Sequence, residues 1–168
     1  MTTEAHDIEG FLDLSVALTG VSKFELQGTG QASLFYSTSQ DILGDRILTE
    51  LLQAFQNARA RADSGAVSLS ESIQQDVLGS EKHGPIARNI IKLWYLGTWY
   101  QLPGAWRNSF GVHPKDVTFV LSPAAFTEGL LWPTLGVNPP GAKAQGYGSW
   151  AGKPYPLDTQ SGNPPSRR

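Results

Sequence analysis

The residues best suited to proton transfer or metal binding near neutral pH are three histidines, and no common motif joins them. His6, His83 and His113 stand far apart in the chain. Histidine can act as an acid, a base or a metal ligand, but His83 precedes Gly84 and His113 precedes Pro114, residues typical of turns. We therefore interpret all three as structural or solvated, and predict no catalytic residue and no metal site.

Other chemistry-bearing patterns also favour ordinary structural roles. The run Gly28-Thr29-Gly30 imitates the start of a dinucleotide fingerprint, but Ser33 takes the third small position and no convincing strand precedes it. The serines lie in no nucleophile-elbow motif. Carboxylate pairs such as Glu9 with Asp13 fit solvated helix faces. The chain has no cysteine, which removes thiol catalysis and disulfides. We predict no cofactor-binding residue.

The composition indicates one lightly charged domain. A length of 168 residues suits a single domain with a real core. Only 17% of the residues are charged, against about 25% in typical soluble domains. A net charge of -2, without runs of Lys or Arg, argues against nucleic-acid binding. No apolar run approaches the ~20 residues of a membrane span.

The elements that must position these residues are predicted to be helices. Residues 8–19 carry an apolar stripe that ends before Gly20, a left-handed C-cap position. Residues 21–36 are expected to be irregular. A second helix to about residue 62 is predicted from a capping box at Ser37 and Gln40 and from an apolar face at three-and-four spacing, namely Leu43, Ile47, Leu48, Leu51, Leu52 and Phe55.

Shorter helices are predicted in the second half. They cover residues 70–78, residues 85–101, and a segment that begins with the hydroxyl cap Ser122 before Pro123 and ends before Pro133. Only residues 117–121 have strand-like content. The predicted fold class is therefore all-α: a single irregular helical domain over residues 1–132 with long loops.

An extended tail is predicted over residues 133–168, packing on a partner. Seven of the 11 prolines and six of the 18 glycines lie there, and no apolar period continues. The tail nevertheless holds Tyr147, Trp150 and Tyr155, which a solvated linker would not need. We expect these three side chains to contact another protein.

The aromatic helix supplies the remaining predicted contact residues. Residues 90–100 are apolar on nearly every face, with Lys92 as the only charge, and such a helix must be covered on all sides. Burial in the chain's own core and burial against a partner both fit, and the two are compatible. We predict a partner interface formed by Trp94, Tyr95, Trp99, Trp106, Tyr147, Trp150 and Tyr155.

Three short blocks together resemble one protein family. Residues 11–20, FLDLSVALTG, are similar to its opening F-x-x-L-S-x-x-L-T-G; residues 91–97, IKLWYLG, resemble its W-Y-x-G helix; residues 148–154, GSWAGKP, look like its closing W-x-x-x-P. The family is the small, or gamma, subunit of bacterial FAD-dependent sugar and polyol dehydrogenases, such as sorbitol, fructose and glucose dehydrogenases. The segment from Trp99 to Val117 is richer than the family's usual link, which suggests a different docking surface or substrate preference.

The resemblance implies a non-catalytic subunit that stabilises or chaperones a large flavoprotein of the glucose–methanol–choline type. FAD and the catalytic residues would lie in that partner, and a cytochrome or another electron acceptor would be reached through it. Members often carry a twin-arginine signal, and residues 1–10 have none. The expected location is therefore cytoplasmic, with a periplasmic location as the alternative if such a signal has been removed. Two rival readings are a helical binding or scaffold module for an unrelated protein, and a self-sufficient helical enzyme.

Overall fold

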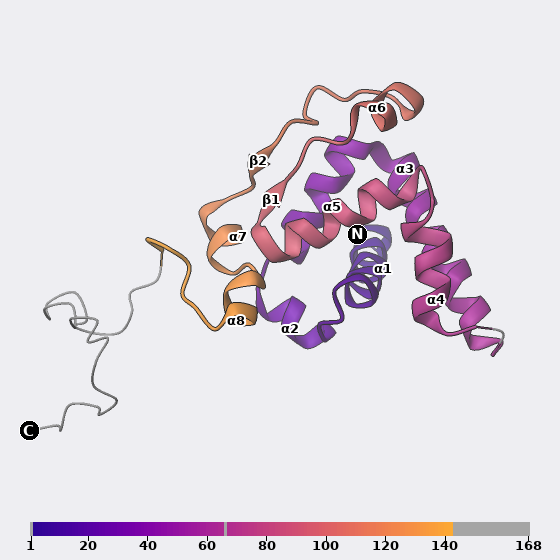
Figure 1. Ribbon diagram of the computed structural model, residues 1–168, viewed down its shortest axis with the longest axis horizontal. Helices are drawn as coiled ribbons and strands as arrows, with labels where there is room; N and C mark the ends of the chain where they lie inside the picture. Colours follow the sequence, from indigo (N-terminus) through magenta and orange to yellow (C-terminus); the bar gives the residue numbers. More distant parts are fainter. Residues whose placement is uncertain (1, 66, 143–168) are drawn as a thin grey trace, which may run out of the picture.

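A computed structural model describes residues 2–65 and 67–142, with side chains from Asp7 onward. The described chain is built from helices, with one two-stranded sheet, so the predicted all-α class is confirmed. Figure 1 shows the arrangement. In chain order the elements are α1 (Thr2–Thr19), α2 (Lys23–Gly28), α3 (Ala32–Asp63), α4 (Leu69–Ile73), the π-helix η1 (Gln74–Leu78), α5 (His83–Leu96), β1 (Thr98–Trp99), α6 (Gly104–Phe110), β2 (Phe119–Val120), α7 (Pro123–Thr127) and α8 (Leu131–Leu135).

The first predicted helix is confirmed as α1, which begins earlier than expected, at Thr2. Phe11 and Leu14 are fully buried. The Ser15 hydroxyl bonds back to the carbonyl of Phe11 at 2.8 Å, so this buried polar group has a partner. Gly20 follows the helix with a φ of 72°, the left-handed conformation predicted for its C-cap.

The prediction of an irregular segment over residues 21–36 is wrong. Ser22 and Glu25 form a capping box that starts α2, and α3 already begins at Ala32. Ser37 consequently lies inside α3 rather than at its start, and its hydroxyl donates to the carbonyl of Leu34 at 3.2 Å. The Ser-x-x-Glu spacing at Ser22 was the signal that the sequence interpretation overlooked.

The long helix α3 is kinked at Gly44, whose φ of 75° and ψ of 157° are not helical. On both sides of the kink the predicted apolar face is buried: Leu43, Ile47, Leu48, Leu51 and Phe55 are each at most 7% exposed. The predicted helix over residues 70–78 is present as α4 followed by η1. In η1 the amide of Gly79 donates to the carbonyl of Gln74 at 2.8 Å, which is π-helical spacing.

Helix α5 ends at Leu96 and does not reach the predicted residue 101. Gly97 adopts a φ of 62° and its amide donates to the carbonyl of Leu93, which closes the helix. The chain then enters β1, which pairs antiparallel with β2, so that Trp99 lies opposite Phe119.

The last two helices are shorter than the single one predicted. Ser122 caps α7 as expected, with its hydroxyl accepting from the amide of Ala125, but α7 ends at Thr127. Pro133 lies in the first turn of α8, where its missing amide costs little. Helix α8 therefore crosses the predicted boundary between residues 132 and 133. Residues 143–168, most of the predicted tail, lie outside the described residues.

The core lies where α1, α3 and α5 contact one another (Figure 1). Helix α4 and η1 pack on α3, and α7 and α8 pack on α5. The chain between β1 and β2 contains α6 and runs along α3 and α5 in Figure 1. Among the described residues, no helix is both long and apolar enough to cross a membrane.

Candidate functional site

The three predicted contact tryptophans of the helical body are core residues. Trp94, Trp99 and Trp106 are 1%, 0% and 6% exposed. The chain itself covers all three, which favours the core role for them, and their role as partner contacts stays a prediction. Helix α3 supplies part of the cover: the Phe35 ring meets Trp94 edge to face, with 4.9 Å between ring centroids. The Trp106 indole N–H donates to the carbonyl of Lys82 at 2.7 Å.

The buried Asp116 holds the chain between β1 and β2 in place. Its Oδ1 accepts from the Trp99 indole at 3.0 Å and from the amide of Leu102 at 3.1 Å. The Gln101 side chain donates to the backbone carbonyl of Asp116 at 2.9 Å. Arg107 Nε lies 3.4 Å from Oδ2, close enough for an ion pair although not aligned as a hydrogen bond. A carboxylate that is 2% exposed is satisfied here by fixed donors.

The segment anchored by Asp116 carries a concentration of exposed apolar side chains. Eight large apolar residues are exposed in the described chain, and four of them lie between residues 112 and 120. They are Val112 at 61%, Val117 at 50%, Phe119 at 37% and Val120 at 53%. We call these four residues the 112–120 surface. Isolated exposed apolar residues are ordinary, whereas a cluster of them is typical of a protein-binding surface.

Two hollows adjoin the 112–120 surface. One, of about 250 Å³, is lined by Val112 together with Trp106 and Phe110. The other, of about 360 Å³, is lined by Val117 and Phe119. Asp41 and Ile42 line both hollows. The hollow at Val117 and Phe119 is mainly apolar, whereas the one at Val112 also has charged residues in its lining; both lie beside exposed apolar side chains and could receive side chains from another protein.

The charges at these hollows neutralise each other. Lys115 Nζ lies 2.6 Å from the Asp41 carboxylate, and both side chains are about 60% exposed. The hydrogen bond from Lys115, with its positive charge, lowers the pKa of Asp41 below its ordinary value. The surface is therefore apolar with a self-compensated ion pair, and it would suit a partner surface of low charge.

His83 and His113 each lie near charged side chains, but neither belongs to a metal-binding group within the described chain. No group of three or more His, Asp or Glu side chains there could hold a metal ion. His113 accepts from the amide of Lys115 at 3.2 Å, in a turn as predicted. His83 begins α5, and its Nε2 is buried without a hydrogen-bond partner. Burial, and then the charge of Lys82, lower the pKa of His83, while Glu50 acts in the opposite direction. The side chain of His6 lies outside the description.

The carboxylate pair Glu9 and Asp13 lies at the surface between helices. Both side chains bind Lys23 of α2, with 2.6 Å from Nζ to the Asp13 carboxylate. The hydrogen bonds that Lys23 donates to these carboxylates, that to Asp13 foremost, raise the pKa of Lys23. The group ties α2 to α1 and contributes modestly to stability because it is largely solvated.

The other predicted contact residues remain predictions. Tyr95 is half-buried and so retains some accessible surface. Tyr147, Trp150 and Tyr155 lie outside the described residues. The sequence interpretation missed the 112–120 surface because its apolar residues show no helical period. Val117, Phe119 and Val120, with their strand-like content, were the available signal.

The described blocks of the family resemblance serve the fold itself. In residues 11–20, Phe11 and Leu14 are core residues, the Thr19 hydroxyl donates to the carbonyl of Ser15, and Gly20 caps α1. In residues 91–97, Trp94 is core and Gly97 ends α5. In this chain, most of the side chains named in these two blocks therefore serve its own helical packing. No protein-family model, curated protein or solved structure matches the chain.

Proposed function

We propose that this chain is a non-catalytic small subunit of a heteromeric FAD-dependent oxidoreductase of the glucose–methanol–choline type, acting on a sugar, polyol or glycoside. Its role is to stabilise or chaperone the flavoprotein subunit. FAD, the catalytic residues and the route to an electron acceptor such as a cytochrome belong to that partner. The particular family rests on the sequence resemblance of the three blocks described above.

The observation that carries a binding role is the 112–120 surface. Four exposed apolar side chains lie on a segment fixed by the buried Asp116, and two of them, Val117 and Phe119, line the same hollow and offer a prearranged contact. Covering such side chains stabilises a complex by roughly 25 cal/mol per Å² of apolar area removed from water. Because Asp116 fixes the segment before binding, little ordering cost opposes that gain.

Co-expression with the flavoprotein encoded beside this chain tests the proposal. The soluble yield, the flavin absorbance and the dehydrogenase activity of that flavoprotein should all fall when the small chain is left out. Equal solubility, FAD content and activity without the small chain would refute the proposal. Recovery of an unrelated protein without a flavin band would instead favour the alternative of a binding or scaffold module.

Surface substitutions test the location of the contact. The double variant Val117→Ser, Phe119→Ser should reduce co-purification of the flavoprotein about tenfold or more, since contact residues at the centre of an interface are worth over ~1 kcal/mol each. Phe24→Ser is the matched control, because Phe24 is 84% exposed on α2. Circular dichroism should show both variants folded. Equal loss in the two variants would place the contact elsewhere.

A further inference from the structure

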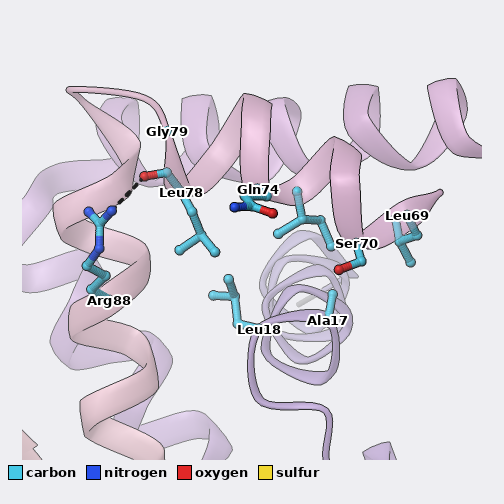
Figure 2. Close-up of a pocket in the computed structure, with 9 residues that line it drawn as sticks. Ala17, Leu18, Leu69, Ser70, Gln74, Leu78, Gly79 and Arg88 are labelled. Carbon is cyan, nitrogen blue, oxygen red and sulfur yellow. Dashed lines mark hydrogen bonds between the residues drawn. The ribbon is translucent and has the colours of Figure 1, made fainter. Parts of the chain in front are cut away.

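A third hollow, of about 670 Å³, lies between the end of α1, the α4–η1 pair and the start of α5. We call it the η1 groove. Figure 2 shows Leu18 and Leu78 directed toward each other within it, with Arg88 on one side and Ser70 on the other. Leu18, Ile73 and Leu78 supply apolar surface, whereas Ser70, Gln74 and Arg88 supply polar groups. Its volume falls within the range of sites that bind other molecules, about 300–1,000 Å³.

Arg88 brings an uncompensated positive charge to this groove. Its Nη2 donates to the carbonyl of Leu78 at 3.0 Å, the hydrogen bond drawn in Figure 2. No ion pair joins Arg88 to a carboxylate in residues 7–65 and 67–142. One neutral carbonyl uses a fraction of the five N–H donors of a guanidinium group. The remaining donors suit a carboxylate, which arginine binds with two parallel hydrogen bonds.

The π-helix and two glycines fix the position of Arg88. A Cβ on Gly79 would lie 2.9 Å from the carbonyl oxygen of Gln75, so the π-turn leaves no room for a side chain there. A Cβ on Gly84 would lie 2.4 Å from the carbonyl oxygen of Leu78. Helix α5 thus packs directly on the end of η1, and this brings the Leu78 carbonyl within reach of Arg88. π-Turns of this kind occur frequently at functional sites.

We propose that the η1 groove binds a segment of a partner polypeptide in which an acidic side chain lies beside aliphatic ones. The carboxylate would pair with Arg88, and the aliphatic side chains would cover Leu18, Ile73 and Leu78. Charge complementarity selects an anionic group, because Arg88 forms no ion pair within the described residues.

A polypeptide fits this groove better than a free fatty acid does. A small-molecule site buries most of its ligand and has few polar groups. The η1 groove instead has polar groups on both sides, with Ser70 and Gln74 available to backbone amides and carbonyls. This inference goes beyond the proposed function, since it holds for any partner that presents such a segment.

Selection of displayed random peptides on the full-length chain tests the proposal. Peptides enriched on the wild-type chain should contain Asp or Glu next to Leu, Ile or Met. A labelled synthetic copy of the most enriched peptide should lose about tenfold or more in affinity for Arg88→Gln, as expected for removing one charge-assisted contact. Arg88→Lys should lose less. Arg59→Gln is the control for loss of an arginine, because Arg59 lines none of the three hollows described above and pairs instead with Asp13.

Two further measurements locate the contact. The methyl signals of Leu18, Ile73 and Leu78 should shift in NMR spectra on peptide addition. Gln74 lines the groove and is exposed. The negative charge of Gln74→Glu should repel the acidic side chain of the peptide and weaken binding, whereas the positive charge of Gln74→Lys should not. Enriched peptides without an acid, equal affinity for Arg88→Gln and Arg59→Gln, or no enrichment at all would each overturn the proposal. Failure of flavoprotein co-expression would leave these results unaffected, so the two proposals fail separately.

Discussion

At the scale of single residues, a few buried polar side chains hold neighbouring chain segments together, and no spacing in the sequence indicated this role. Asp116 is the main example, since it joins Trp99, Leu102 and Arg107 through one buried carboxylate. Its burial explains why Trp99 and the following chain are held against the core. Without those donors a buried charge of this kind would be strongly unfavourable.

Substitution of Asp116 should therefore be costly. Asp116→Ala leaves the Trp99 indole and the Leu102 amide without their acceptor, and should lower the free energy of unfolding by about 2–4 kcal/mol. Asp116→Asn keeps one acceptor oxygen and should cost less. Urea unfolding followed by circular dichroism measures both values. Asp41→Ala, at an exposed carboxylate, should cost under ~1 kcal/mol; an equal loss there would show that Asp116 has no special role.

His83 should make stability depend on pH. Its folded pKa lies below the ordinary value of 6.5, chiefly because of burial. As the pH falls below 6.5, the unfolded chain takes up the proton first, so stability present above that pH is lost as the pH falls through the folded pKa. The protonated Nε2 would also lack an acceptor, since none is present in the described surroundings.

Thermal melts at pH 7.5 and pH 5.5 test this dependence. The wild-type chain should melt at a lower temperature at pH 5.5, and His83→Gln should show a smaller difference between the two pH values. Other groups titrate nearby: Lys82 and Glu50 face His83, and hydrogen bonding to Lys82 lowers the pKa of Glu50. Glu50→Gln is therefore the control, because it removes the titration of Glu50 and keeps His83. An unchanged pH difference in His83→Gln would contradict the assignment.

At the scale of elements, close backbone contacts decided where helices end. The apolar run that begins in α5 continues to residue 100, and periodicity alone would extend the helix through Trp99. The structure ends it at Leu96 because Gly97 turns the chain and lets α7 approach. A Cβ on Gly97 would lie 2.4 Å from the backbone carbon and oxygen of Ala125. Beyond Gly97 the chain enters β1, where Thr98 and Trp99, residue types that favour strands, pair with β2.

Gly97→Ala should therefore be strongly destabilising. The left-handed φ costs an alanine about 1 kcal/mol, and relieving the contact with Ala125 adds to it, for a total of about 3 kcal/mol or more. Gly104→Ala is the matched control, because a Cβ there meets nothing within 4 Å and φ is ordinary. The control should be neutral or slightly stabilising. Chemical denaturation measures both; similar effects would show that the Gly97 contact is unimportant.

At the scale of the whole molecule, the described residues form one hydrophobic core around α1, α3 and α5. The core residues of the described chain lie between Phe11 and Leu130. The interface proposal consequently rests less on the buried tryptophans than on the 112–120 surface, the half-buried Tyr95 and the predicted contacts Tyr147, Trp150 and Tyr155. These places lie in different parts of the chain, as expected for a subunit that contacts a larger protein over an extended area.

Deletion of residues 143–168 separates folding from binding. The shortened chain should keep its helical circular-dichroism signal, with a melting temperature within about 4 °C of the full chain. It should retain less of the co-expressed flavoprotein, because three predicted aromatic contacts are lost. A full chain carrying Tyr147→Ser, Trp150→Ser and Tyr155→Ser controls for length. Loss of the helical signal would show that the core needs the tail, and full retention of the flavoprotein would refute the tail contacts.

The sequence by itself determined the helical class, the apolar faces of α1 and α3, the Ser122 cap and the Gly20 cap. Each of these depends on residues within a few positions of one another, so spacing and local conformational preference suffice. The tertiary structure alone decided which aromatic side chains are covered. Whether Trp94 or Phe119 meets water depends on chain segments far away in sequence. Burial is a property of that packing, and a linear pattern does not specify it.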